Sequence, residues 1–307
     1  QGGIQHEFRS GLSLTATYTR HWWGNFLVTD NLALSPSDYS PFCVTTPVDT
    51  RLPGGGGKQL CGFYDVNPNK VGQVNNYITF AKNYGNETDV YNGVDVATNV
   101  RLPGGILVQG GFSTGREAVN NCDVVGKVDN LGGGVTDVNR SSGSGNSAPL
   151  ISNLTGVGAP SLLYCDNKAP YQTQVKLLGS YPLPWGLSAS AAFQSIPGPQ
   201  ITATYNASNA QVLPTLGRNL SAGAAATATL QLIAPGALYN DRLNQVDARI
   251  TRTFKLGPRR LQAQLDLYNL LNTGPALNQN NTFGGAWLTP TVIPVGRMAK
   301  IGAQLDF

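Results

Sequence analysis

The stretch that decides the fold is RMAKIGAQLDF, residues 297–307. Two alternating sets of side chains make up this stretch: Ala299, Ile301, Ala303, Leu305 and Phe307 on one side, Met298, Lys300, Gly302, Gln304 and Asp306 on the other. A period of two is typical of a β-strand whose two faces meet different surroundings. About ten residues is also the length of a tilted strand that crosses a membrane. An edge strand of a soluble β-sandwich would show the same pattern, so the rest of the chain must distinguish the two.

The same alternation recurs in four pairs of strands, joined by short turns near residues 10, 104, 184 and 258. We expect one domain over 1–307, with strand hairpins at about 1–25, 88–118, 171–205 and 244–272 and a closing strand at 296–307. Long segments without a strand period separate the hairpins. Short turns at one end and long loops at the other are typical of an outer-membrane barrel. The sequence therefore predicts an all-β fold: an antiparallel transmembrane β-barrel, of which about nine strands are present, with long extracellular loops.

In such a barrel the polar side chains of each strand face the lumen. The residues that we expect there are Asp95, Arg101, Lys176, Arg249, Gln264 and Asp266. Arg252 falls on the apolar face, so either its side chain extends to the membrane interface or a bulge shifts the register. The cluster RHWW, residues 20–23, suits a membrane–water interface.

Composition and charge exclude several classes of protein. Charged residues make up 12% of the 307, with 37 Gly and 19 Pro, which favours an all-β chain with polar loops over a helical one. The net charge of +4 is spread along the chain and makes no case for nucleic acid as a partner. No apolar run reaches the length of a transmembrane helix.

Four cysteines, Cys43, Cys61, Cys122 and Cys165, form no C-x-x-C pair. With two histidines in the chain we expect no metal site and no cofactor. An even number of cysteines in a loop-rich chain indicates disulfides and an oxidising compartment. Three connectivities are possible. We favour Cys43–Cys61 and Cys122–Cys165, because each pair lies within one segment between strands.

None of the remaining motifs has the pattern of a catalytic site, and we expect that the chain is not an enzyme. GFSTG, residues 111–115, matches a nucleophile elbow, but Ser113 continues a strand and both histidines precede it. The glycine run before Lys58 lacks the spacing of a phosphate-binding loop and predicts a flexible loop. DVNPN at 65–69 is interpreted as a turn rather than a calcium loop, and RSSGSG at 140–145 as surface. Asp95, Asp247 and Asp266 are interpreted as single solvated carboxylates.

Nearly the whole chain resembles the C-terminal barrel portion of TonB-dependent receptors, most closely the Oar-like group whose full chains begin with a carboxypeptidase-regulatory-like domain. The matching stretches are RLPGGGG (51–57), CGFYDV (61–66), YNGVD (91–95), LLGSYPLPW (177–185), RLNQ (242–245), DLYNLLN (266–272) and the end from 296 to 307. The aromatic carboxyl terminus resembles the closing strand of bacterial outer-membrane barrels, which implies that Phe307 serves as the assembly signal.

The resemblance implies a wall of a receptor barrel whose loops face a substrate for uptake, in contact with outer-membrane lipid. Such barrels have about 22 strands, whereas about nine are found here, and the plug domain through which the TonB system would act is absent. Nine strands cannot close as a simple antiparallel barrel, so the rest of a larger barrel or copies of the chain are expected partners. The alternative is a structural subunit of an extracellular tubular or fibrous assembly, built from strands whose open edges pair.

Overall fold

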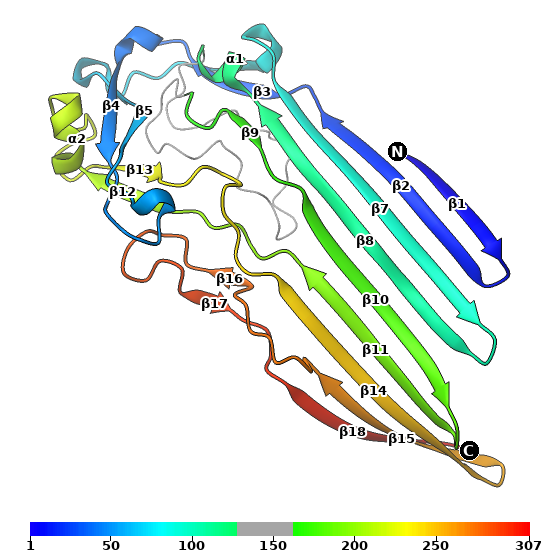
Figure 1. The fold of residues 1–307 in the computed structure, drawn as a ribbon. Helices are drawn as coiled ribbons and strands as arrows, with labels where there is room; N and C mark the ends of the chain where they lie inside the picture. The colour runs from blue at the N-terminus through cyan, green and yellow to red at the C-terminus, as the bar shows by residue number, and fades with distance from the viewer. Residues whose placement is uncertain (128–161) are drawn as a thin grey trace.

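The computed structural model describes residues 1–127 and 162–307, and one large antiparallel sheet dominates it (Figure 1). Nine strands follow one another in this sheet: β1 (Gly2–Arg9), β2 (Leu12–Trp23), β7 (Thr88–Leu102), β8 (Ile106–Asn120), β10 (Gln172–Leu183), β11 (Leu187–Ile196), β14 (Leu243–Leu256), β15 (Arg259–Tyr268) and β18 (Met298–Asp306). A short strand, β9 (Asp166–Lys168), pairs with the end of β8. The predicted all-β, antiparallel fold is confirmed.

The strand hairpins occupy nearly the predicted ranges, with one exception. The range 171–205 extends too far, because β11 ends at Ile196. Pro197 and Pro199 follow it, and a proline offers no N–H to a sheet ladder. The end of the predicted range, residues 201–205, does not extend β11. Instead β12 (Thr204–Ser208) pairs with β13 (Thr227–Gln231) in a separate small sheet.

The long segments fold into a layer that we call the cap: residues 24–87, 121–127, 162–165, 169–171, 197–242 and 269–297. Figure 1 shows it at the end of the sheet opposite the short turns. Besides β12–β13, its elements are β3 (Leu27–Asn31) with β6 (Asn76–Phe80), β4 (Tyr39–Thr45) with β5 (Gln59–Val66), β16 (Asn278–Gln279) with β17 (Pro290–Val292), the helices α1 (Cys122–Val125) and α2 (Asn209–Leu216), and the 3-10 turns η1 (Pro36–Asp38), η2 (Pro53–Gly55), η3 (Pro68–Lys70) and η4 (Ala81–Asn83).

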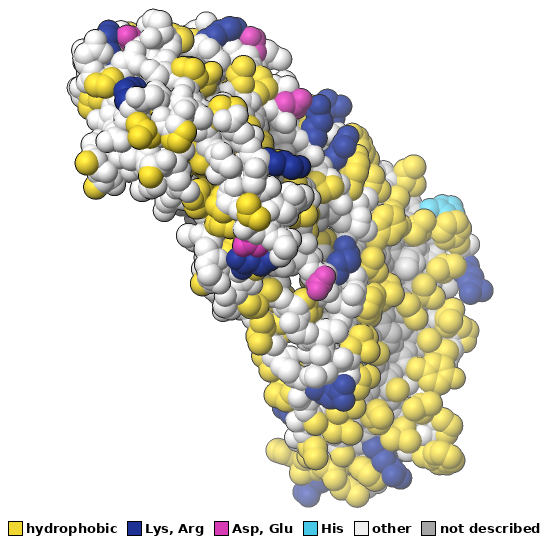
Figure 2. All heavy atoms as spheres, turned by 60° about the vertical axis from the view of Figure 1, so that its left-hand side comes forward, with side chains coloured by type: hydrophobic (Ala, Val, Ile, Leu, Met, Phe, Trp, Pro, Cys, Tyr) yellow, Lys and Arg dark blue, Asp and Glu magenta, His cyan; other side chains and the backbone are white. Residues whose placement is uncertain are grey.

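The buried hydrophobic core lies in the cap and not on the large sheet. Phe63, Leu230, Val44 and Val212 are fully buried in one cluster formed by β4, β5, α2, β12 and β13. By contrast, large apolar side chains along the sheet are exposed, and Ile301 of β18 reaches 84%. In Figure 2, hydrophobic side chains gather over the strand-bearing part, while the cap surface is mostly polar. The sheet therefore exposes large apolar side chains, whereas the cap buries its own.

Strand register separates the two faces of the sheet. In antiparallel pairs, directly opposed residues share a face. One face carries rows of apolar residues, such as Ala16, Val96 and Phe112, or Tyr181, Ala189 and Ile250. We call it the apolar face, and the opposite one the polar face.

Arg252 lies on the apolar face, opposite Leu187 and Ala263, and no bulge shifts the register of these pairs. The predicted alternative of a bulge is therefore wrong. The guanidinium group lies 4.8 Å from the ring centre of Phe254, one step closer to the short turn.

The glycine run at 54–57 is a hydrogen-bonded turn, which corrects the expectation of a flexible loop. The Gly55 N–H donates to the Leu52 carbonyl (2.9 Å), and the Gly57 N–H donates to the Thr46 carbonyl (3.1 Å). Gly56 has a φ of +70°, and a Cβ there would lie 1.9 Å from the Pro47 oxygen. A residue with a side chain could not close this turn without moving the backbone.

No helix among residues 1–127 and 162–307 is long and apolar enough to cross a membrane. The low-complexity stretch at 140–145 lies outside the described residues.

Candidate functional site

The six residues predicted to face a lumen all lie on the polar face. Register places Asp95 opposite Ser113, Lys176 opposite Gly111, and Gln264 opposite Thr251. One row across the sheet contains the other three, and its members are Arg101, Leu107, Ser180, Ser190, Arg249, Asp266 and Lys300. The structure thus brings the predicted residues onto one surface.

Asp266 is not the solvated carboxylate that the sequence suggested. It is 2% exposed and forms an ion pair with Arg249 of the neighbouring strand, whose Nη2 donates to Oδ2 at 3.2 Å. Lys300 lies opposite it on β18. The cross-strand pair was invisible to sequence reasoning because it depends on the register of β14 against β15.

A pocket of about 340 Å³ opens where β8, β10, β11 and β14 meet. Its polar lining is Gln109, Lys176, Gln194, Gln245 and Asp247. The row through the pocket contains Gly111, opposite Lys176, and a Cβ at Gly111 would lie 1.8 Å from the Val96 oxygen. The absence of a side chain at Gly111 therefore lets the backbones of β7 and β8 approach each other closely.

Hydrogen bonds order one side of this pocket. Gln194 Nε2 donates to Gln245 Oε1 (3.1 Å), and Gln245 Nε2 donates to Asp247 Oδ1 (2.9 Å). Asp247 Oδ1 also accepts the backbone N–H of Asn269 (2.8 Å). Amide, ammonium and carboxylate groups in this order can bind polar ligands by hydrogen bonds. Sequence reasoning named Lys176 and Asp247 separately but missed the two glutamines, since the cluster spans three strands.

The motifs RLNQ and DLYNLLN form the junction between sheet and cap. Arg242 donates to the Thr173 carbonyl (2.6 Å) and, through Nε, to Ser195 Oγ (3.2 Å). Asn269, with a φ of 49°, donates to the carbonyls of Thr273 and Val295, each at 2.9 Å. These contacts hold distant segments at the ends of strands, so the motifs position the cap.

Two ionic contacts fasten the cap internally. Asp65, near the end of β5, pairs with Arg218 and accepts the Ser221 N–H (2.9 Å). The turn predicted after Asp65 is formed by η3. Arg51 pairs with Asp49 at 2.7 Å and donates to the Trp287 carbonyl (3.0 Å). The hydrogen bond from the Arg51 guanidinium lowers the pKa of Asp49 below its usual value, so this carboxylate stays charged in mild acid.

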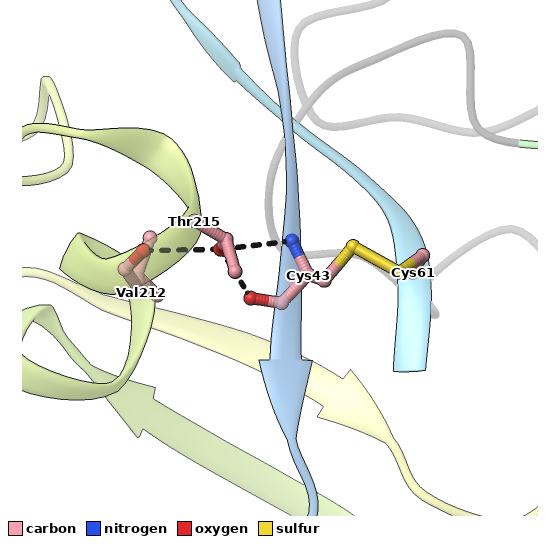
Figure 3. The surroundings of a disulfide bond; sticks show 4 residues. All are labelled: Cys43, Cys61, Val212 and Thr215. Atoms are coloured by element: carbon pink, nitrogen blue, oxygen red, sulfur yellow. Dashed lines mark hydrogen bonds between the residues drawn. A yellow bond between two sulfur atoms is a disulfide. The ribbon is translucent and has the colours of Figure 1, made fainter. Parts of the chain in front are cut away.

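The two predicted disulfides are confirmed, and both lie in the cap. Cys43–Cys61 joins β4 to β5, and Cys122–Cys165 joins the start of α1 to the residue before β9. Figure 3 shows Thr215 of α2 against the first of them: its hydroxyl accepts the Cys43 N–H at 3.0 Å and donates to the Cys43 carbonyl. The disulfide strand and the helix are thereby held together.

Reduction of both disulfides is expected to loosen the cap and leave the large sheet intact, because the sheet's ladder hydrogen bonds do not depend on them. Limited proteolysis with and without reductant should show new cleavage between residues 43 and 61, while the far-ultraviolet β signal is unchanged. Loss of the β signal on reduction would contradict this prediction.

Ser113 lies within β8 between Asp95 and Gln174, so the strand-to-helix turn of a nucleophile elbow is not formed at GFSTG. Among the described residues, no three His, Cys, Asp or Glu side chains gather as a metal site. Phe307 follows the last residue of β18 and is 96% exposed, and its role in assembly stays a prediction.

No protein-family model matches the chain, and no curated protein matches it. Among solved structures, the chain is similar to the crystal structure of the outer membrane transporter YddB from Escherichia coli, with 12% sequence identity and a TM-score of 0.43. The match covers 98% of this chain and 31% of that one, so the chain spans about a third of the transporter's length. At this identity and TM-score the likeness assigns neither a family nor a function.

Proposed function

We propose that the chain forms part of the wall of an outer-membrane transporter barrel, with its apolar face against lipid. The observation that carries this proposal is the distribution of exposed apolar side chains: they cover one face of a nine-stranded sheet, while the buried core lies in the cap. A soluble sheet of this size would bury such a face against a second layer. In a bilayer the lipid takes that place.

In this arrangement the polar face lines the interior and the cap forms the substrate-facing mouth outside the cell. The pocket beside Lys176 would then lie along the path of a polar ligand. The motifs at 242–245 and 266–272 support the finer assignment to a TonB-dependent, receptor-like barrel for ligand uptake. The TonB system would act only through a plug domain supplied with the rest of the barrel.

Two variants, each with one added cysteine, test whether the chain lies in the outer membrane and which end of the sheet faces outward. All four native cysteines are paired, so a new thiol is a specific label site. Asn69→Cys lies in the cap and Lys255→Cys beside the short turn of β14–β15, and both positions are exposed. A membrane-impermeant maleimide should label Asn69→Cys on intact cells and Lys255→Cys only after the outer membrane is permeabilised. Equal labelling of both on intact cells would contradict a membrane barrel.

A structural role outside the cell is the second candidate, because the sheet has two open edges within residues 1–127 and 162–307. β1 and β18 each hydrogen-bond to one neighbouring strand, and exposed edges are templates for pairing with other chains. Copies of the chain could then build a tube or fibre without lipid. Equal labelling on intact cells, together with recovery of the chain in large lipid-free particles, would favour this candidate.

We further propose that the chain has no catalytic role and does not bind nucleic acid. The placement of Ser113 inside a strand and the pairing of Asp266 with Arg249 support the first statement.

A further inference from the structure

Two arginines interrupt the apolar face at its cap end. Register places Arg20 of β2 opposite Asn92 of β7, and Asn92 opposite Arg116 of β8. These three residues, which we call the arginine row, lie on the same face as Tyr18, Val94 and Phe112. The two guanidinium groups are therefore carried by strands that flank one central strand, about 10 Å apart at the backbone.

The arginine row presents hydrogen-bond donors and no acid. Within residues 1–127 and 162–307, neither Arg20 nor Arg116 forms an ion pair with a carboxylate, and both side chains are exposed. Asn92 Oδ1 accepts the Tyr18 hydroxyl at 2.7 Å, which leaves the Asn92 amide NH₂ between the two arginines. Arg116 is oriented by Tyr171, whose ring centre lies 4.7 Å from the guanidinium carbon. The row is therefore prepared for an anion.

The surroundings of the row indicate which kind of anion it meets. Tyr18, Trp22 and Tyr171, with 47%, 69% and 55% of their surfaces exposed, stand around it. Exposed aromatic residues at the border of an apolar surface are typical of a membrane–water interface. Lys168 of β9 lies on the same face, opposite Ala118, but it is paired with Asp166 at 3.3 Å and is not counted in the row. At that depth in a bilayer the anions are the phosphates of lipid head groups.

We propose that the arginine row binds the phosphate groups of a phosphorylated glycolipid of the lipid A type in the leaflet next to the cap. This inference rests on the proposed function, which places the cap outside the outer membrane. The planar guanidinium group donates two parallel hydrogen bonds to a phosphate, and the Asn92 amide and Tyr18 hydroxyl suit sugar hydroxyls. Arg252, which is alone among basic residues in its row at the opposite end of the apolar face, offers no such pair and serves as a control.

The test uses the full chain in phosphatidylcholine nanodiscs that contain either bisphosphorylated lipid A or the same lipid with its phosphates removed. Native mass spectrometry counts the glycolipids retained by the chain. We expect retention of the phosphorylated lipid and a decrease of about tenfold in its affinity for the double variant Arg20→Gln/Arg116→Gln. Arg252→Gln should bind as the unaltered chain does, and Arg116→Lys should lose part of the affinity, because lysine keeps the charge without the planar fork.

The possible failures are distinguishable. The lipid site would be overturned if the chain entered nanodiscs but retained both lipids equally, or if the double variant retained the phosphorylated lipid as well as the unaltered chain does. Neither result would contradict the barrel proposal. Equal labelling of Asn69→Cys and Lys255→Cys on intact cells, which contradicts a membrane barrel, would overturn both.

Discussion

Replacement of Ala191 by arginine is expected to destabilise the chain in a bilayer by about 2–4 kcal/mol, whereas replacement of Ala192 should cost much less. The two residues are neighbours near the middle of β11, so the chemical change and the depth are matched. Ala191 lies on the apolar face, opposite Gly179 and Ala248, and an arginine there would be placed in hydrocarbon. Ala192 lies on the polar face opposite Asp247, where an arginine meets water and a carboxylate.

This difference can be measured by urea unfolding of both variants in lipid vesicles. The folded fraction is read from the electrophoretic shift between folded and heat-denatured chain. The free energy of unfolding should fall strongly for Ala191→Arg only. If the two variants lost the same amount, the assignment of the apolar face to lipid would be wrong. The comparison needs no knowledge of the ligand, because it tests the solvent on each face.

The main sheet could be predicted from the sequence because its determinants are local. Each strand alternates apolar and polar residues, as from Val94 to Arg101, and each turn carries its own glycine or proline. These signals survive without any knowledge of the neighbouring strand. The third hairpin was extended too far for the same reason: 201–205 has β-strand composition, but the two prolines before it had already ended β11.

The cap could not be predicted in the same detail, because its elements depend on partners far away in the chain. β4 and β5 are stabilised by α2, over 140 residues later, through Thr215 and the cluster around Phe63. α2 itself has a local signal, since Ser208 and Gln211 form a capping box and Gly217 ends the helix in the left-handed region. Gly56 shows why composition alone was misleading. A glycine run is typical of a flexible loop, but here a side chain at position 56 would clash with the Pro47 oxygen, so glycine is required.

The polar face was predicted residue by residue, yet its clusters were not. The period of two places Lys176 and Asp266 on the correct face, but register decides their neighbours. Pairing of Asp266 with Arg249, and of Gln194 with Gln245, follows from the alignment of β11, β14 and β15. The arginine row could not be predicted for a related reason. Within one strand, an arginine on the apolar face is an isolated exception, and only the register of three strands shows that two such arginines lie in one row.

Phe63→Ala is expected to lower the free energy of unfolding of the cap by about 3–5 kcal/mol. Phe63 is fully buried, its ring centre is 5.6 Å from that of Phe42, and it packs in the cluster that joins β4–β5 to α2 and β12–β13. Loss of the ring leaves a cavity at the point where these elements meet. Gln59→Ala, at an exposed position of the same strand, is the matched control and should change the stability little.

Hydrogen exchange followed by mass spectrometry separates the cap from the sheet in this experiment. In Phe63→Ala, amides of β4, β5 and β12 should exchange faster by two orders of magnitude or more, as about 3–5 kcal/mol requires when exchange is limited by local opening. Amides of β7, β8 and β10 should keep their protection, because their ladder contains no residue of the cap cluster. Faster exchange in the sheet as well would show that cap and sheet unfold as one unit. Independent opening would mean that the mouth of the proposed barrel can move while its wall stays folded, as a ligand-binding mouth requires.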